Sequence, residues 1–415
     1  MTREWGAADW VALAAITMVA AGLRGFRLTV PSLMVFDEYH YTREACWYVR
    51  GAADCGLPLQ HTESHPPLAK WFIGWGIQTF GHTPLGWRIA SVVAGILTVA
   101  LLYLLARKLL RSTVGAVLAS GFLAIDPVHF VHSRIAMPDV FSTLFAVAAI
   151  LFCVYDREAL SPTGERGRSL TDALFGHRWR VAAGVALGAA TAVKWSSLPF
   201  LIAVPFLTVA WQIAARRADG GGAAVARAAR EEGPSIVFAL VLLPFLIYVA
   251  TYIGTPPAAR ASGLVNSWIG SVVRQHIFMV QFQLGLSITE RFQTSPWWWV
   301  RLGRPAFYFT LVDELGYRLV LAFGNPTLLI TLPAIAYIAV RAVRQRAVDP
   351  ADMTILTCFV LAYGFLLATA GRRPAYMYYL LTAIPFMYLA PARLAATLTG
   401  SYRATLAMRA WIVLS

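Results

Sequence analysis

The chain is poor in charged residues and in cysteine. Asp, Glu, Lys and Arg make up 13% of its 415 residues, about half the roughly 25% that is usual in soluble domains. Its four cysteines show no CxxC spacing, and only Cys46 and Cys55 share a polar segment. A disulfide between them and two free thiols both fit that spacing. With 58% hydrophobic residues, this composition excludes a soluble enzyme, a disordered chain and a disulfide-stapled secreted domain.

Signatures of several other functions are also missing. The triplet Gly220-Gly221-Gly222 lacks the strand and the lysine of a phosphate-binding loop. Asp126, His129 and His132 have side chains that can bind metals, but their spacing beside a proline fits a hydrogen-bonded cluster better than a metal site. We therefore expect no metal site. No internal repeat is visible, which argues against a transporter built from inverted halves.

Long apolar runs dominate what is present. A membrane-crossing helix needs roughly 20 mostly apolar residues. No small-residue cleavage site follows the first run, so we expect it to be retained as a span. The sequence predicts an all-α polytopic membrane protein of about 10–11 transmembrane helices, forming one domain over residues 1–415. The runs lie near residues 8–26, 85–106, 113–126, 138–155, 181–195, 197–214, 234–253, 317–340, 354–370 and 375–392, with a further run from 405 to the end.

The formal net charge of +14 indicates membrane topology rather than nucleic-acid binding, because most arginines fall in short loops between apolar runs. If the N-terminus is cytoplasmic, one set of alternate loops holds nearly all of them. The positive-inside rule then places the other set of loops outside the cell. The cytoplasmic set contains Arg107, Lys108, Arg111, Arg157, Arg166, Arg168, Arg178, Arg180, Arg216, Arg217, Arg227, Arg230, Arg341, Arg344, Arg346, Arg393, Arg403 and Arg409.

Two outward segments, residues 27–84 and 254–316, are too long to be simple turns. They are rich in Trp, Tyr, Phe and His rather than in the residues typical of disorder. We therefore expect two ordered extracytoplasmic loops that cap the outer face of the bundle.

The first of these loops opens with Asp37 and Glu38, about ten residues past the first span. Adjacent carboxylates near a bilayer are costly unless they are hydrated, paired or used in chemistry. Asp37 is equally well placed to be the N-cap of an interfacial helix that runs to Val49. Further on, His65 precedes a diproline and Lys70 follows it. That stretch reads either as part of a site or as the extended entry to an amphipathic helix.

Outward cations are informative because positive-inside sorting disfavours them. Arginine beside an aromatic belt can hold a lipid phosphate through bidentate hydrogen bonds. The tryptophan run 297–299 is also explained by anchoring at the headgroup level alone. The outward candidates are Arg88, Arg134 with nearby Asp139, Lys194, Arg301 and Arg304 after the tryptophan run, and Arg373.

Together with the stretches around them, these residues resemble those of the protein O-mannosyltransferases of the GT-C glycosyltransferase superfamily, from about residue 30 to 392. No single stretch is specific, but their shared order and topology are. The matching stretches are Asp37-Glu38-Tyr39-His40, His65-Pro66-Pro67-Leu68-Ala69-Lys70, Trp87-Arg88-Ile89, Ser133 to Asp139, Val193-Lys194-Trp195-Ser196, Ser295-Pro296-Trp297-Trp298-Trp299, Arg304-Pro305, Gly324-Asn325-Pro326, Arg373, Tyr378-Tyr379 and Ile384-Pro385-Phe386.

The resemblance implies a GT-C bundle that transfers mannose, with inversion, from polyprenyl-phosphate-mannose to Ser or Thr hydroxyls of exported proteins. Asp37 would be the catalytic base, and Glu38 would position the base or the acceptor. No cofactor beyond the lipid-linked sugar donor is expected. The implied location is the cell membrane with an extracytoplasmic site, where coupling to the secretion translocon is conceivable. The expected substrate and lipid-phosphate contacts are His65, Lys70, Arg88, Arg134, Asp139, Lys194, Arg304 and Arg373.

The residues leave two rival hypotheses open. One is a GT-C enzyme that uses a polyprenyl-phosphate sugar to modify a lipid or glycan; labelling of a Ser/Thr peptide would exclude it. The other is a secondary transporter, which would place its ionisable groups near the bilayer midplane rather than beyond the first span. Residues 254–316 are also too few for the β-trefoil domain of eukaryotic members, which indicates the simpler prokaryotic form.

Overall fold

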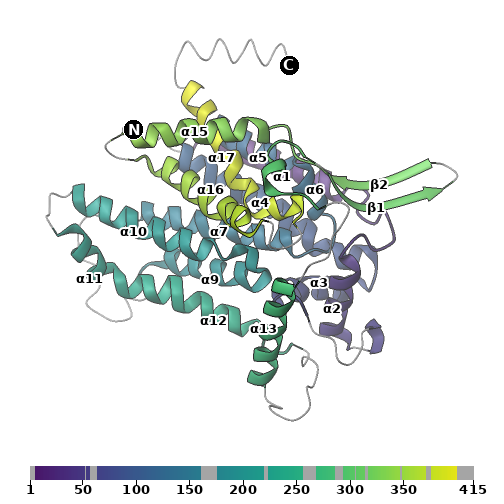
Figure 1. Cartoon of the computed structure of the whole chain (residues 1–415). Coiled ribbons are helices and arrows are strands. Elements are labelled where there is room, and N and C mark those ends of the chain that lie inside the picture. The colour runs from purple at the N-terminus through teal and green to yellow at the C-terminus, as the bar shows by residue number, and fades with distance from the viewer. Residues whose placement is uncertain are drawn as a thin grey trace.

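The computed structural model describes residues 5–51, 53–56, 63–159, 175–218, 223–255, 268–285, 293–303, 305–313, 316–345, 348–370 and 375–399. Most of the long helices lie side by side along one direction (Figure 1). The helices are α1 (Ala7–Gly25), α2 (Glu38–Arg50), η1 (Ala53–Cys55), α3 (Leu68–Phe80), α4 (Pro84–Leu110), α5 (Thr113–Ala124), α6 (Pro127–His132), α7 (Asp139–Glu158), α9 (Arg178–Val193), η2 (Trp195–Ser197), α10 (Phe200–Ala218), α11 (Ala224–Val237), the π-helical turn η3 (Phe238–Leu242), α12 (Leu243–Ala250), α13 (Trp268–Gly285), α14 (Pro296–Trp299), α15 (Leu328–Arg344), α16 (Pro350–Thr369), η4 (Met377–Thr382) and α17 (Ile384–Thr399).

Six helical stretches of the described chain are long and apolar enough to cross a membrane. The predicted runs 113–126, 181–195 and 375–392 correspond to shorter helices, α5, α9 and α17. The polytopic helical fold predicted from the sequence is therefore confirmed. The six stretches are Ala7–Gly25, Pro84–Leu110, Asp139–Glu158, Trp195–Arg217, Ala224–Ala250 and Pro350–Thr369.

Small residues let the central helices approach closely. In α9, Gly184 and Gly188 are one helical turn apart and face η3 and α12. A Cβ at Gly184 would collide with the carbonyl oxygen of Ala239, and a Cβ at Gly188 would lie 2.7 Å from the Cβ of Ile247. Close backbone approach at such small-xxx-small pairs is how helices associate in a bilayer, where apolar side chains gain little from leaving lipid.

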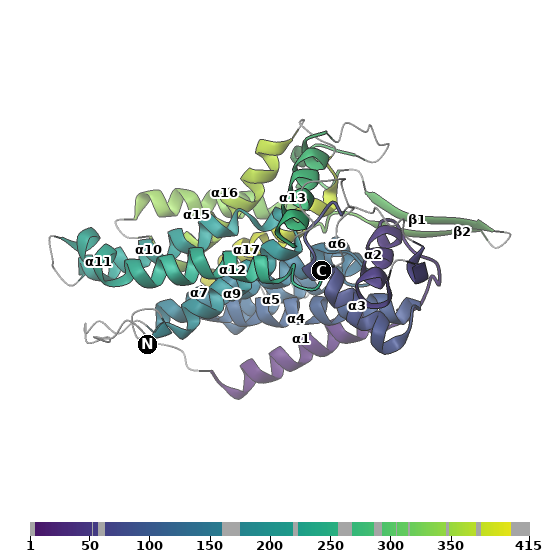
Figure 2. The same ribbon diagram turned by 90° about the horizontal axis from the view of Figure 1, so that it is seen from below.

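The two ends of the bundle differ in character. The last turn of α10 and the first turn of α11 lie at one end, whereas α2, α3 and α6 lie at the other (Figures 1 and 2). Near the first end, Arg107 of α4 pairs with Asp9 of α1 at 2.6 Å, and Arg180 of α9 pairs with Asp156 of α7 at 2.9 Å. The arginine-rich end and the end that carries the first long loop are thus opposite.

The first predicted outer loop is ordered in its described part. A helix begins after Asp37, which is one of the two possibilities that the sequence left open: α2 packs on α3, and η1 follows α2. Cys46 and Cys55 form a disulfide with their Cα atoms 5.7 Å apart, which decides between the two states that the spacing left open. Cys153 and Cys358 are free and buried.

The prediction of one span over residues 317–340 is wrong for its first part. Gly316–Ala322 is strand β2, which pairs antiparallel with β1 (Ala306–Asp313), and α15 begins only at Leu328. The stretch Tyr-Arg-Leu-Val-Leu-Ala-Phe reads as an apolar run, but its residues alternate on the two faces of a strand. The resulting hairpin extends beyond the bundle at the end that carries α2, α3 and α6 (Figures 1 and 2).

Candidate active site

Asp37 lies immediately before the first residue of α2 and is half-buried. Its side chain makes no capping hydrogen bond to that helix, so the N-cap explanation of this carboxylate does not hold. The preceding residue, Phe36, has a positive φ of 53°. A bulky residue in this region carries strain of order 1–3 kcal/mol, which is typical of functional sites.

Glu38 and Arg88 form the buried support beneath Asp37. The two oxygens of Glu38 accept hydrogen bonds from Nε and Nη2 of Arg88 at 2.9 and 2.8 Å. They also accept hydrogen bonds from the backbone N–H groups of Val35 and Ala136, both at 2.8 Å. One carboxylate therefore joins the turn before Asp37, helix α4 and the segment between α6 and α7.

Arg88 is saturated by protein acceptors. Besides Glu38, its Nη1 donates to the carbonyl oxygens of Leu28 at 3.1 Å and Pro31 at 2.7 Å. Its Nη2 donates to the carbonyl oxygen of Leu33 at 2.9 Å. A guanidinium has five N–H donors, and each has an acceptor here. This geometry assigns Arg88 to shaping the loop that carries Asp37, whereas the sequence suggested a phosphate contact.

Asp139, Lys194 and His132 form a second cluster. Nζ of Lys194, just past the end of α9, lies 2.8 and 3.0 Å from the two oxygens of Asp139 at the start of α7. Nδ1 of His132 lies 4.0 Å from an oxygen of Asp139. Burial lowers the pKa of His132 to about 4. The imidazole is therefore neutral near pH 7, and the carboxylate is balanced by lysine.

Tyrosines join the two clusters. Burial raises the pKa of Tyr308, and the charges of Asp139 and Asp37 add to the rise. The same two carboxylates also raise the pKa of buried Tyr41 of α2, after burial itself, so Asp37 and Asp139 are both within electrostatic range of these two tyrosines. Nζ of Lys194 lies 5.7 and 5.4 Å from the ring centroids of Tyr378 and Tyr379, a cation–π geometry.

The sequence did not identify Tyr308 as a site residue. Its hydroxyl is 2.7 Å from Nε2 of His132, and its ring centroid is 5.1 Å from that of Phe36. Tyr308 occupies a β-bulge, because the register of the two strands shifts between Phe307 and Phe309. A bulge aims one extra side chain out of the normal alternation, and pairing of this kind leaves no local signal in the sequence.

Lys70 and His65 lie in the outer cap around the site. Nζ of Lys70 is 2.5 Å from Glu63 and 3.2 Å from Glu44, and it donates to the carbonyl oxygen of His65 at 2.8 Å. Glu63 also accepts hydrogen bonds from Tyr48 at 2.7 Å and Gln275 of α13 at 3.0 Å. The two carboxylates neutralise the charge of Lys70. The hydrogen bond between Glu63 and Gln275 connects the first outer segment to the second.

The remaining predicted residues are dispersed or lie outside the described part. Arg134 is half-buried, and its Nη2 donates to the carbonyl oxygens of Phe26 at 2.8 Å and Arg27 at 3.0 Å, just after α1. Arg304 and Arg373 fall outside the described residues. Within the described residues, no group of three or more His, Cys, Asp or Glu side chains could hold a metal ion.

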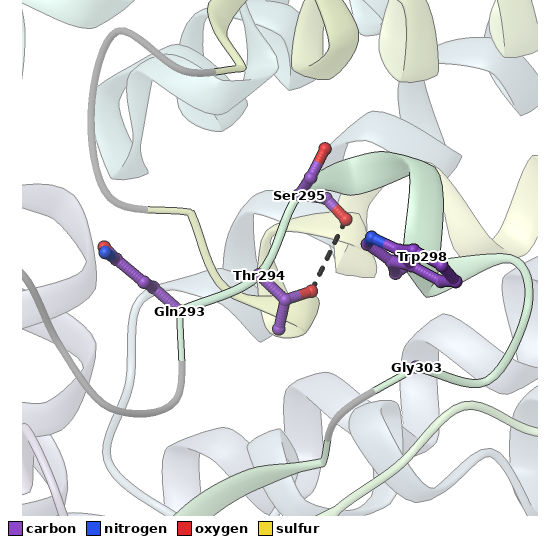
Figure 3. A pocket seen from close by; sticks show the side chains of 5 residues that line it. All are labelled: Gln293, Thr294, Ser295, Trp298 and Gly303. Carbon is purple, nitrogen blue, oxygen red and sulfur yellow. Dashed lines mark hydrogen bonds between the residues drawn. The ribbon is translucent and has the colours of Figure 1, made fainter.

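The tryptophan run borders a pocket next to the tyrosines. Trp299 is fully buried and donates to Oγ1 of Thr294 at 3.0 Å, whereas Trp297 and Trp298 are exposed. The backbone N–H of Thr294 donates to the carbonyl oxygen of Ala375 at 2.8 Å, which links this run to the tyrosine segment 376–379. The pocket does not include Asp37. It holds about 430 Å³ and is lined by Gln293, Thr294, Ser295, Trp298 and Gly303 (Figure 3).

Comparisons with known sequences point to one family. The family model described as dolichyl-phosphate-mannose-protein mannosyltransferase matches residues 76–254. The polyprenol-phosphate-mannose–protein mannosyltransferase of Mycobacterium tuberculosis is 27% identical, over 92% of this chain and 79% of its own. The enzyme of the same name from Corynebacterium glutamicum is also 27% identical, over 95% and 84%.

Comparisons with solved structures support the same fold. The Saccharomyces cerevisiae protein O-mannosyltransferase Pmt1-Pmt2 complex, bound to the sugar donor, superposes with a TM-score of 0.80 at 13% identity, over 100% of this chain and 88% of that one. ArnT from Cupriavidus metallidurans bound to undecaprenyl phosphate gives 0.57 at 16% identity, over 94% and 60%. The chain is thus similar to protein mannosyltransferases over more than nine-tenths of its length, and it has the same fold as the solved protein O-mannosyltransferase complex.

Proposed function

We propose that this protein transfers mannose from a polyprenyl phosphate to Ser or Thr hydroxyls of exported polypeptides, with inversion at the sugar carbon. The observation that carries the proposal is the state of Asp37. This half-buried carboxylate makes no capping hydrogen bond to the helix it precedes, follows a strained Phe36, and rests on a buried Glu38–Arg88 pair. The similarity to polyprenol-phosphate-mannose–protein mannosyltransferases over more than nine-tenths of the chain supports it.

The chemistry is a single displacement. The acceptor hydroxyl oxygen attacks C1 of mannose on the face opposite the phosphate, and the bond between C1 and the phosphate oxygen breaks. Asp37 accepts the hydroxyl proton as the new bond forms, and the bonding electrons leave with the lipid phosphate. A positioned general base contributes roughly 10²–10⁴-fold to such a step.

Glu38 and Arg88 are positioning residues in this mechanism. Their paired hydrogen bonds hold the loop and the first turn of α2, so that the Asp37 carboxylate meets the acceptor in one orientation. Bidentate pairs of this kind fix geometry as well as charge. Lys70 has a similar supporting role in the cap through its pairs with Glu44 and Glu63, beside His65.

Cations must stabilise the charge that develops on the departing phosphate. Lys194 is the first candidate in the described part because it lies beside the tyrosine cluster and is held by Asp139. Arg134 is the second candidate. It is half-buried, and its guanidinium lies against the segment just after α1. Arg304 and Arg373 complete the proposed set. No cofactor besides the lipid-linked sugar is proposed.

We place the enzyme in the cell membrane, with the N-terminus cytoplasmic and the Asp37 end outside. The arginine-rich loops at the opposite end support that orientation through the positive-inside rule. The Cys46–Cys55 disulfide, in the same outer segment as Asp37, also fits an oxidising compartment. An extracytoplasmic site would meet unfolded polypeptides as they emerge from the secretion translocon.

The proposed function is tested by supplying donor and acceptor to the purified full-length protein in lipid vesicles. The donor is polyprenyl-phosphate-mannose with labelled sugar, and the acceptor is a Ser/Thr-rich peptide beside a matched peptide with alanine at every hydroxyl position. We expect label in the first peptide only. Transfer to lipid or glycan instead of peptide would contradict the proposed acceptor, and no transfer from this donor would contradict the reaction.

A further inference from the structure

We propose that the β1–β2 hairpin is a docking edge for the acceptor: an extended polypeptide adds to it as a third strand and is thereby led to Asp37. The proposal rests on the proposed function, since it concerns the acceptor of that reaction. It adds a binding surface outside the catalytic cluster and a backbone mode of recognition, which would let one enzyme accept hydroxyl residues in varied sequences.

The base of the hairpin belongs to the site. Tyr308 is buried, its hydroxyl is 2.7 Å from His132, and its ring meets Phe36, the neighbour of Asp37. Ala306 and Ala322, which pair at the open end of the two strands, are buried as well. A chain that lies along the hairpin therefore runs into the neighbourhood of Asp37.

The rest of the hairpin reaches away from the bundle. Burial falls along it, so that Val312 is 62% and Leu319 47% exposed. The described sheet contains only these two strands. In a two-stranded sheet, alternate residues of each strand direct N–H and C=O groups away from the partner strand, which makes an edge that another extended chain can join. From Tyr308 to Asp313 this edge measures about 17 Å.

The position of the hairpin favours a polypeptide over lipid as the occupant. Both views show it extending along the direction of the long helices, beyond the end that carries α2 and α3 (Figures 1 and 2). Lipid chains surround the sides of such a bundle rather than the space beyond its end. Addition of a strand to a sheet edge takes its affinity from main-chain hydrogen bonds, so it tolerates many side chains.

Peptide length and backbone methylation test the docking directly. A short acceptor, with one Thr and two residues on each side, is compared with acceptors that carry eight further residues on the N-terminal or the C-terminal side. We expect the extension on one side to lower KM at least fivefold. N-methylation along that extension should raise KM at every second position and have little effect between them, because only alternate N–H groups face the hairpin. Each lost hydrogen bond corresponds to roughly two- to tenfold in KM.

A shortened hairpin provides the matched variant. Replacing residues 312–317 with Asn-Gly joins Leu311 to Arg318, which already face each other, through a favoured two-residue turn. This variant keeps only residues 308–311 of the proposed edge. It should keep the kcat and KM of the short peptide, which reports an intact site, and the advantage of the extended peptide should become smaller. The donor KM should not change.

Each outcome decides the proposal. Strand addition is supported if the effect of N-methylation on KM repeats every two residues in the wild type and weakens in the shortened hairpin. Transfer to peptides with no gain from length, or with a flat methylation scan, overturns the docking edge and leaves the proposed function standing. A gain from length that is as large in the shortened hairpin as in the wild type places the docking elsewhere. No transfer to any peptide overturns both proposals.

Discussion

At the residue scale, the central distinction is between the charge that we propose to take part in the reaction and the charges that support the loop around it. The sequence placed Asp37 and Glu38 side by side, and the structure gives them different surroundings. Glu38 is fully buried under Arg88, whereas Asp37 is half-buried at the start of α2. The sequence singled out Asp37, Glu38 and Arg88 as candidates, but it could not show that Arg88 donates its hydrogen bonds to loop carbonyls, because those partners are up to 60 residues away.

Removing Arg88 should therefore affect stability before it affects donor use. Arg88→Met leaves Glu38 buried without its cation, which we expect to cost about 3–5 kcal/mol. The double variant Arg88→Met/Glu38→Gln should recover part of that loss, because no unpaired buried charge remains. The midpoint of thermal inactivation in vesicles measures both. A stable Arg88→Met protein with a raised donor KM would instead restore the phosphate contact suggested by the sequence.

The buried His132 predicts a pH dependence of stability. Its pKa in the folded protein is about 4 because of burial, whereas an unfolded histidine takes up a proton near pH 6.5. Between these two pH values the unfolded state binds a proton that the folded state does not. The free energy of unfolding is therefore unaffected by this histidine above pH 6.5 and decreases as the pH falls toward 4, by about 2 kcal/mol at pH 5. Nearby Asp139 opposes this depression of the pKa and Lys194 adds to it.

His132→Gln should make the thermal midpoint less sensitive to pH between 7.5 and 5. The exposed His40→Gln variant is the control and should follow the wild type. If wild type and His132→Gln lose the same stability over this range, His132 does not stay neutral in the folded protein.

At the element scale, local patterns predicted the helices well and the hairpin not at all. Helix α2 begins directly after Asp37, which is one of the two possibilities that the sequence left open. Residues 316–322 were taken as the start of a span because an apolar strand and an apolar helix look alike over so few residues. The pairing with Ala306–Asp313, and the bulge that aims Tyr308 at His132, depend on long-range contacts.

The Cys46–Cys55 disulfide anchors the far end of α2 and so belongs to the support of Asp37. It closes a loop of about ten residues, which corresponds to about 2–3 kcal/mol in a chain-entropy treatment. Cys46→Ser/Cys55→Ser should lower the thermal midpoint, and a reductant should lower that of the wild type to a similar value. The double variant itself should not respond to reductant. A response there would show that the effect of the reductant does not come from this disulfide.

At the scale of the whole molecule, the bundle has two different ends. The short helices α2, α3 and α6 and the hairpin lie at one end (Figure 1), and the buried arginine pairs Arg107–Asp9 and Arg180–Asp156 lie toward the other. The sequence predicted this division because loop charge and span length are read directly from composition. It could not predict which side chains of distant segments meet, and the joining of the Asp37 and Asp139 clusters by tyrosines came only from the fold.

The orientation can be checked with single cysteines at opposite ends. Ser32→Cys lies in the exposed loop before α2, and Ala229→Cys lies on an exposed face of α11. A membrane-impermeant thiol reagent should label Ser32→Cys in intact cells and Ala229→Cys only after lysis. The wild-type protein controls for its own thiols, and the reverse pattern would put Asp37 on the cytoplasmic side.

The most direct test of Asp37 as the base is the single-turnover rate of mannose transfer by Asp37→Asn beside Asp54→Asn. Asp54 is an exposed carboxylate of the same outer segment, so it controls for the loss of one charge near the site. We expect Asp37→Asn to lose roughly a hundredfold or more in rate, with donor binding retained and Asp54→Asn close to wild type. A near-normal rate for Asp37→Asn would contradict this assignment.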